Sequence, residues 1–133
     1  MRSRRRLHTT IALSLPLLGG CDTAAPIACS TVFQAVTVAV VDSTAAPVPD
    51  ATVIATLMRT GERLSPTSLA LLTSGTYILV DDGSREKLRT AGDSVGVTAR
   101  RGTGPTTAAM YFIDVPGGCD VRKVSGPDTL TVH

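Results

Sequence analysis

The side chains with the greatest potential for chemistry are three cysteines, Cys21, Cys29 and Cys119. A thiol can be acylated, oxidised to a disulfide or used as a metal ligand, and its surroundings decide which. A serine nucleophile needs a general base, and the only histidine after residue 21 is His133, the last residue of the sequence. The sequence therefore predicts no catalytic residue, and we interpret the protein as a non-enzyme.

Cys21 ends a segment that has the three zones of a bacterial export signal. Four arginines fall within residues 1–6, an apolar stretch covers residues 11–18, and small residues precede the cysteine. These zones define a secretory signal, and the apolar run is shorter than the ~20 residues of a membrane-spanning helix. The alternatives are an ordinary signal peptide and a buried N-terminal helix, with Cys21 incidental in both.

The quartet Leu18-Gly19-Gly20-Cys21 resembles the lipobox of bacterial lipoproteins. The resemblance implies that diacylglycerol is transferred to the Cys21 thiol, that the chain is cleaved before Cys21, and that the new N-terminus is acylated. Two or three acyl chains anchor a protein stably where one chain is marginal. We therefore expect a lipid anchor in the inner or outer membrane of the cell envelope, with the protein facing the periplasm or the exterior.

Cys29 and Cys119 form an even pair once Cys21 is assigned to lipid. In an oxidising compartment, an even pair favours a disulfide, which here would tie the start of a domain to its end. Two free thiols or half of a metal site are the alternatives, and two thiolates alone do not complete a zinc site. We expect a signal peptide over residues 1–20, a lipidated tether over 21–28 and one domain over 29–133.

The formal charge of +2 at pH 7 is dominated by the leader. Without the four arginines of residues 1–6, 9 basic residues remain against 11 acidic ones. This balance leaves no basic stripe for nucleic acid, so we expect no nucleic-acid partner. We interpret the short basic clusters as solvated charges. They are Arg85–Lys87–Arg89, Arg100–Arg101 and Arg122–Lys123.

Four acidic residues, Asp81, Asp82, Glu86 and Asp93, come close together in the sequence. Their spacing does not match the Asp-x-Asp-x-Asp-Gly pattern of an EF-hand calcium loop. We interpret residues 81–92 as a solvated polar loop. The sequence thus predicts no metal site and no cofactor.

The remaining sequence divides into short extended runs separated by turn residues. Val32, Val36, Val38 and Val40 illustrate the period of two that a half-buried strand requires. About seven such strands with turns between them predict an all-β fold, a small Ig-like or transthyretin-like β-sandwich. The expected strands cover residues 32–41, 51–58, 76–80, 94–100, 106–115 and 128–133, with a further strand or a helical turn over 64–73.

Three of these segments resemble the carboxypeptidase regulatory-like (transthyretin-like) β-sandwich family. The family pattern is a first strand, a turn reading roughly Gly-x-Pro-Val-x-Gly-Ala-x-Val, and a later Gly-x-Tyr that opens a strand. Ala46 and Asp50 stand where the family often has glycine. The resemblance covers about residues 32–100 and implies an accessory or binding module. The segments are residues 36–42 (VTVAVVD), 47–53 (PVPDATV) and 74–77 (SGTY).

Together, these patterns predict a non-catalytic, membrane-anchored lipoprotein of the cell envelope. We expect its β-sandwich to dock another envelope component through loops or a sheet edge. A lipoprotein that binds a small ligand or a peptide is the alternative, and a small hydrolase is a third hypothesis. A pocket lined by convergent polar residues would favour ligand binding.

Overall fold

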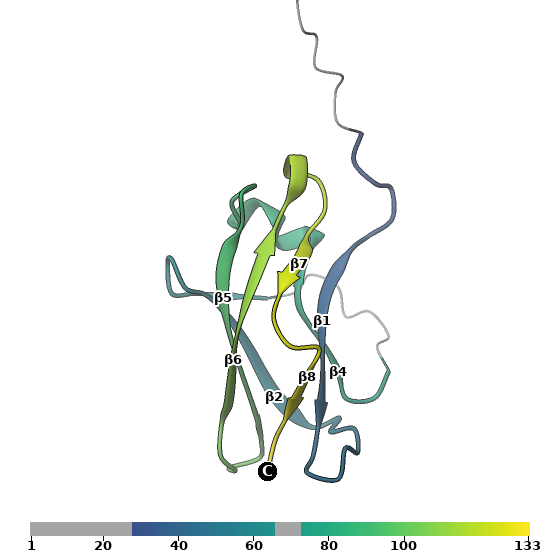
Figure 1. Ribbon diagram of the computed structural model, residues 1–133, viewed down its shortest axis with the longest axis vertical. Coiled ribbons are helices and arrows are strands. Elements are labelled where there is room, and N and C mark those ends of the chain that lie inside the picture. Colours follow the sequence, from purple (N-terminus) through teal and green to yellow (C-terminus); the bar gives the residue numbers. More distant parts are fainter. Residues whose placement is uncertain (1–27, 66–72) are drawn as a thin grey trace, which may run out of the picture.

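The computed structural model describes residues 28–65 and 73–133, and this part of the chain forms two packed β-sheets (Figure 1). The prediction of an all-β sandwich is confirmed. No helix among the described residues is long and apolar enough to cross a membrane. The elements are β1 (Ala35–Val41), β2 (Ala51–Leu57), β3 (Glu62–Leu64), β4 (Thr76–Asp81), the 3-10 helix η1 (Asp82–Lys87), β5 (Asp93–Arg101), β6 (Thr107–Asp114), the 3-10 helix η2 (Pro116–Gly118), β7 (Arg122–Ser125) and β8 (Thr129–Thr131).

The smaller sheet has the strand order β4-β1-β8, and the larger sheet has the order β3-β2-β5-β6-β7. β1 pairs antiparallel with β4 and parallel with β8, whereas every pair in the larger sheet is antiparallel. The residues that lead into β1 and the η2 turn lie at one end of the sandwich, and the C-terminus lies at the other (Figure 1). We call the first end the disulfide end, because it holds Cys29 and Cys119.

The core forms where the alternating apolar residues of the two sheets face each other. Val36, Val38 and Val40 of β1 are buried, as the alternation predicts. The larger sheet contributes the other side, with the same period of two on each long strand. Its buried residues include Ala55 and Leu57 of β2, Val95, Val97 and Ala99 of β5, and Tyr111 and Ile113 of β6, with Val115 just after it.

The chain crosses from the larger sheet to the smaller one over the ring of Tyr111. The Tyr111 hydroxyl donates a hydrogen bond to the Pro127 carbonyl at 2.8 Å. Gly126 lies against the ring with φ +128°, and a Cβ there would stand 2.4 Å from the ring carbon Cδ1. Burial raises the pKa of Tyr111 to about 12, with a smaller contribution from the charge of Asp128. Gly126 therefore allows the chain to pass this buried aromatic residue on its way to β8.

The turn between β1 and β2 is held by Tyr77 at the start of β4. The Tyr77 hydroxyl donates to the Val48 carbonyl at 2.7 Å and accepts from the Ala51 amide at 2.9 Å. Gly75 has φ +77°, and a Cβ there would stand 2.8 Å from the Cβ of Pro47. The Gly-x-Tyr and Pro-Val-Pro segments that carry the family resemblance thus meet at one corner of the sandwich.

Two short strands differ from the sequence prediction. β3 begins at Glu62, between the strands expected over 51–58 and 64–73, and β7 falls in a stretch where we expected no strand. β7 lies at the edge of its sheet and three of its four residues are exposed, so it lacks the alternation that identifies buried strands. The strand expected over 64–73 falls mostly on residues 66–72, which lie outside the described residues.

Two further expectations are corrected near the disulfide end. β1 begins at Ala35 and not at residue 32, and Val32 and Phe33 are exposed. Residues 82–87 form η1 and not an open polar loop. The chain before β1 is fixed by hydrogen bonds between Gln34 and Asp82 of η1, and local sequence patterns do not encode such a contact.

Candidate functional site

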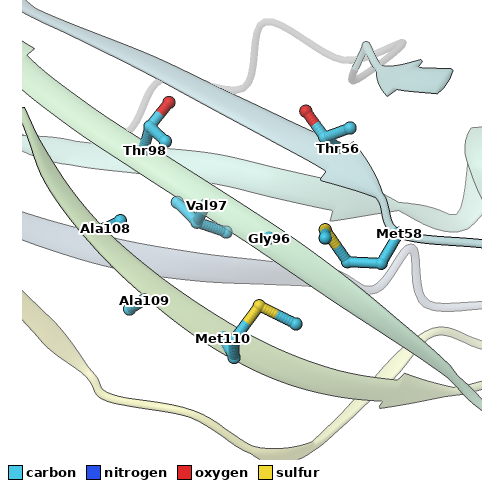
Figure 2. Close-up of a pocket in the computed structure, with 8 residues that line it drawn as sticks. All are labelled: Thr56, Met58, Gly96, Val97, Thr98, Ala108, Ala109 and Met110. Carbon is cyan, nitrogen blue, oxygen red and sulfur yellow. The ribbon is translucent and has the colours of Figure 1, made fainter. Parts of the chain in front are cut away.

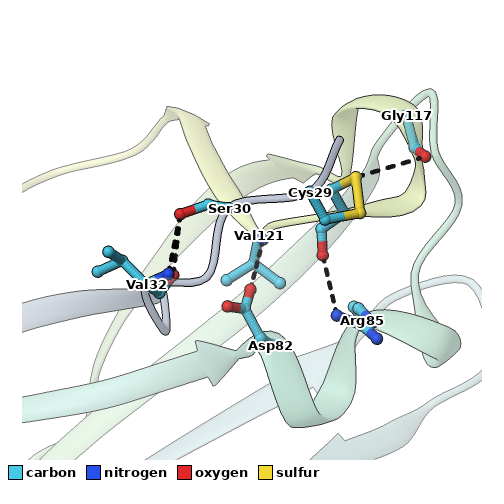
Figure 3. The surroundings of a disulfide bond; sticks show 8 residues. Cys29, Ser30, Val32, Asp82, Arg85, Gly117 and Val121 are labelled. Carbon is cyan, nitrogen blue, oxygen red and sulfur yellow. Dashed lines mark hydrogen bonds between the residues drawn. A yellow bond between two sulfur atoms is a disulfide. The ribbon is translucent and has the colours of Figure 1, made fainter. Parts of the chain in front are cut away.

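The disulfide end is held together by the bond between Cys29 and Cys119, with an S–S distance of 2.02 Å and Cα atoms 5.0 Å apart. The predicted pairing of these two cysteines is confirmed. Arg85 of η1 donates a hydrogen bond to the Cys119 carbonyl at 3.3 Å, so the helix packs beside the bridge (Figure 3). Cys21 lies outside the described residues.

Asp82, the first residue of η1, connects three segments at this end. Its carboxylate accepts from the backbone amide of Gln34 at 2.7 Å and from that of Val121 at 2.9 Å. The Asp82 amide in turn donates to the Gln34 carbonyl at 3.1 Å. The hydrogen bond to Val121 is visible beside the bridge in Figure 3. Asp82 therefore fixes the entry to β1 and the entry to β7 against the same helix.

Asp93 is fully buried at the start of β5 and binds two arginines. It accepts from Nε of Arg59 at 3.1 Å, from Nε of Arg89 at 2.8 Å and from the Arg89 amide at 2.9 Å. Burial of the carboxyl acts to raise its pKa, but these hydrogen bonds and the positive charge of Arg59 outweigh it and hold the pKa of Asp93 below its ordinary value. The Asp93 carboxylate is thus ionised, and both of its oxygens accept hydrogen bonds from Arg59 and Arg89.

The interpretation of the acidic group as a solvated loop is wrong for two of its members. Asp81 and Asp93 are completely buried, and Ser84 donates a hydrogen bond to Asp81 at 3.4 Å. Among the described residues, no three His, Cys, Asp or Glu side chains gather in a way that could hold a metal ion. The buried Asp81 and Asp93 carboxylates are held by hydrogen bonds within the disulfide end.

The basic clusters also form ion pairs, which we did not expect of solvated charges. Lys87 pairs with Glu62 at 2.7 Å, Arg101 with Asp50 at 3.4 Å and Arg122 with Asp114 at 2.6 Å. The Lys123 ammonium bonds the carboxylate of Asp128. The cationic heads of Arg89 and Arg122 nevertheless reach solvent, because their partner carboxylates lie on the inner side of each pair.

A shallow apolar hollow of about 560 Å³ lies on the outer face of the larger sheet (Figure 2). Gly96 of β5 forms its floor, and the thioethers of Met58 and Met110 lie on either side of it. Both methionines are exposed, and Thr56 and Thr98 add hydroxyl groups at the rim. The hollow exists because glycine places no side chain between two long flexible ones.

The outward position of Met110 follows from strand alternation, since its neighbour Tyr111 is buried. The hollow itself was not predicted, because it requires Gly96 of β5 to pair with Met110 of β6. A glycine in the middle of an otherwise regular strand is the signal that points to it, since such a glycine often marks a close approach or an open surface. The hollow is lined mainly by apolar atoms and not by the convergent polar groups that we expected of a ligand site.

The remaining residues considered for chemistry do not converge on a catalytic arrangement. His133 is exposed at the C-terminal end, and its side chain makes no hydrogen bond to a serine in the described part of the chain. Among the aromatic residues, Tyr111 is buried, whereas Tyr77 and Phe112 are half-buried. Comparison with known proteins finds no family, no curated protein and no solved structure that matches this chain.

Proposed function

We propose that this protein is a lipid-anchored, non-catalytic β-sandwich module of a bacterial cell envelope. The observation that carries the proposal is the Cys29–Cys119 bond. Since the chain has three cysteines, this bond leaves Cys21 with no cysteine partner in the same chain. Cys21 is also the residue that ends the lipobox-like quartet, so the sequence motif and the cysteine pairing support the same assignment.

In this proposal, residues 1–20 are removed, Cys21 carries the acyl chains and residues 21–28 connect it to the domain. The protein contacts the membrane through the anchor and docks another envelope protein through the sandwich. The corner formed by Tyr77, Val48 and Ala51 supports a relationship to the carboxypeptidase regulatory-like family. The full burial of Asp93 and its binding by two arginines support a role without acid–base catalysis at this residue, because its carboxylate is not accessible to a substrate.

The test is the mass and location of the protein in its host. Membrane-extracted protein is expected to show the loss of residues 1–20 and the addition of acyl mass. Cys21→Ser is expected to abolish that mass and to move the chain from the membrane to the soluble fraction, because no acyl chain remains to partition into the bilayer. Intact mass spectrometry and fractionation measure both effects.

The matched control is the double variant Cys29→Ser/Cys119→Ser, which removes two cysteines and keeps Cys21. The fraction of this variant that is not degraded is expected to keep the acyl mass. A free, unmodified Cys21 thiol in membrane-extracted wild-type protein would refute the lipid anchor.

A small-ligand-binding lipoprotein is the second candidate, and the hollow around Gly96 is the observation in its favour. Its volume falls within the roughly 300–1,000 Å³ of small-molecule sites, and methionines suit adaptable apolar recognition. A small apolar ligand is expected to shift the methyl NMR resonances of Met58 and Met110. Gly96→Val should remove this shift by filling the floor, while Thr129→Val on the other sheet should keep it. Unchanged resonances across a ligand panel would exclude this candidate.

A further inference from the structure

Exposed apolar residues follow directly on the disulfide at the end where the chain enters the sandwich. Val32 and Phe33 lie three and four residues after Cys29, and their exposed fractions are 64% and 50%. Val32 points away from the bridge and from Asp82 in Figure 3. Large apolar side chains exposed together at one place often mark a surface that contacts a membrane or another protein.

The ion pairs at the same end expose their positive partners. Arg89 has a side-chain exposed fraction of 61%, whereas its partner Asp93 is fully buried. Arg122 is 63% exposed, and its partner Asp114 only 14%. Arg85 is exposed as well and lies against the disulfide through its bond to Cys119. The guanidinium groups of Arg89 and Arg122 are therefore more exposed than the carboxylates that balance them, and Arg85 adds a third exposed guanidinium at this end.

The position of the proposed anchor sets which end of the domain is near the bilayer. Eight peptide links separate Cys21 from Cys29, and they span at most about 30 Å. The nine-residue strand β5 is itself about 30 Å long. The anchor therefore holds the disulfide end beside the membrane, while the end with the Tyr77 corner and the C-terminus is separated from it by the length of the sandwich.

We infer that the disulfide end of the sandwich contacts the anionic lipid headgroups of the membrane that holds the anchor. Arg85, Arg89 and Arg122 face lipid phosphates, and Val32 and Phe33 rest at the boundary between headgroups and acyl chains. Arginine binds phosphate through several N–H groups at once, and each basic residue near an anionic surface adds to the attraction. The inference rests on the proposed lipid anchor and adds an orientation to it, with the opposite end directed at a partner.

The chain has no tryptophan, so one introduced indole reports on its own surroundings. The acylated protein carrying Phe33→Trp is reconstituted into phosphatidylcholine vesicles containing a quarter phosphatidylglycerol, with bromine on the acyl chains as quencher. A second protein carries His133→Trp at the opposite end. We expect the bromolipid to quench the indole at position 33 several-fold more strongly than the indole at position 133. Intact mass, measured first, establishes acylation separately.

Charge is tested in the Phe33→Trp protein by the pair Arg85→Gln/Arg122→Gln and the matched pair Arg100→Gln/Arg101→Gln. Each pair removes two exposed positive charges, the first at the disulfide end and the second at the far end of β5. Only the first is expected to reduce quenching, and circular dichroism verifies that all variants fold. Equal quenching at positions 33 and 133, or equal effects of the two pairs, would overturn the inference. An unquenched indole at position 33 in acylated, vesicle-bound protein would also overturn it, and would favour a protein partner at this end.

Discussion

Replacing Cys29 and Cys119 together by serine is expected to lower the free energy of unfolding by about 4–5 kcal/mol. The bridge closes a loop of 90 residues, and a loop this long removes much conformational freedom from the unfolded chain, because its ends can otherwise separate widely. Total stabilities of domains of this size are only about 5–15 kcal/mol. The loss is therefore large enough to leave the domain marginally stable.

Urea unfolding followed by circular dichroism measures the effect on the chain without its leader. Cys21→Ser is the matched control, since it also replaces a cysteine by serine and leaves the bridge intact, and it should unfold as the wild type does. The double variant is preferable to either single one, because a single variant leaves a free thiol that can pair with Cys21. A change of less than about 1 kcal/mol in the double variant would show that the bridge does not constrain the unfolded chain.

Asp93→Asn is expected to lower the free energy of unfolding by about 2–4 kcal/mol. Hydrogen bonds to charged groups contribute roughly 1.5–3 kcal/mol each, and Asp93 makes such bonds with Arg59 and Arg89. The loss stays below the sum of these values because both arginines reach solvent and can be hydrated once the carboxylate is gone. Asp114→Asn is the matched control, and its loss should be about 1 kcal/mol, since its partner Arg122 lies at the surface.

The same residue makes stability depend on pH. The pKa of Asp93 is lower in the folded protein than in the unfolded chain, so its contribution is complete above the unfolded pKa of about 3.9 and is lost as the pH falls through the folded value. The wild type should lose stability in acid below about pH 4. Asp93→Asn should show a smaller loss over that range, while Asp42 and Asp114, whose pKa values are also lowered, keep part of it. Parallel pH curves for the two proteins would contradict this role of Asp93.

The fold was largely predictable because each long strand shows an alternation of apolar residues within its own sequence. The alternation through Val36, Val38 and Val40 identifies a buried face without knowledge of the partner strand. The pairing of Cys29 with Cys119 was also predictable, because it depends on a count of cysteines and not on geometry. The three- and four-residue strands β3 and β7 carry too few residues for a periodic pattern.

The features of the disulfide end were not predictable for a different reason. Acidic residues are usually exposed, and burial of Asp93 becomes favourable because Arg59, from the turn after β2, joins the nearby Arg89 in binding its carboxylate. Asp82 likewise finds its partners Gln34 and Val121 far along the chain. The hollow over Gly96 depends on which strand lies beside which. In each case the signal lies in pairs of residues that are distant in the sequence.

The covalent ring closed at Cys29 and Cys119 also determines how the domain responds to mechanical load. A pull between the proposed anchor and His133 enters at Cys29 and passes through the two sulfur atoms to Cys119, bypassing the residues between them. Only residues 120–133 can then be drawn out, which is about 50 Å of extended chain and not the roughly 350 Å of the whole domain. Force applied by a bound partner would unfold β7 and β8 at most. Strands β1 to β6 lie between the two bridged cysteines and would not be extended by that force.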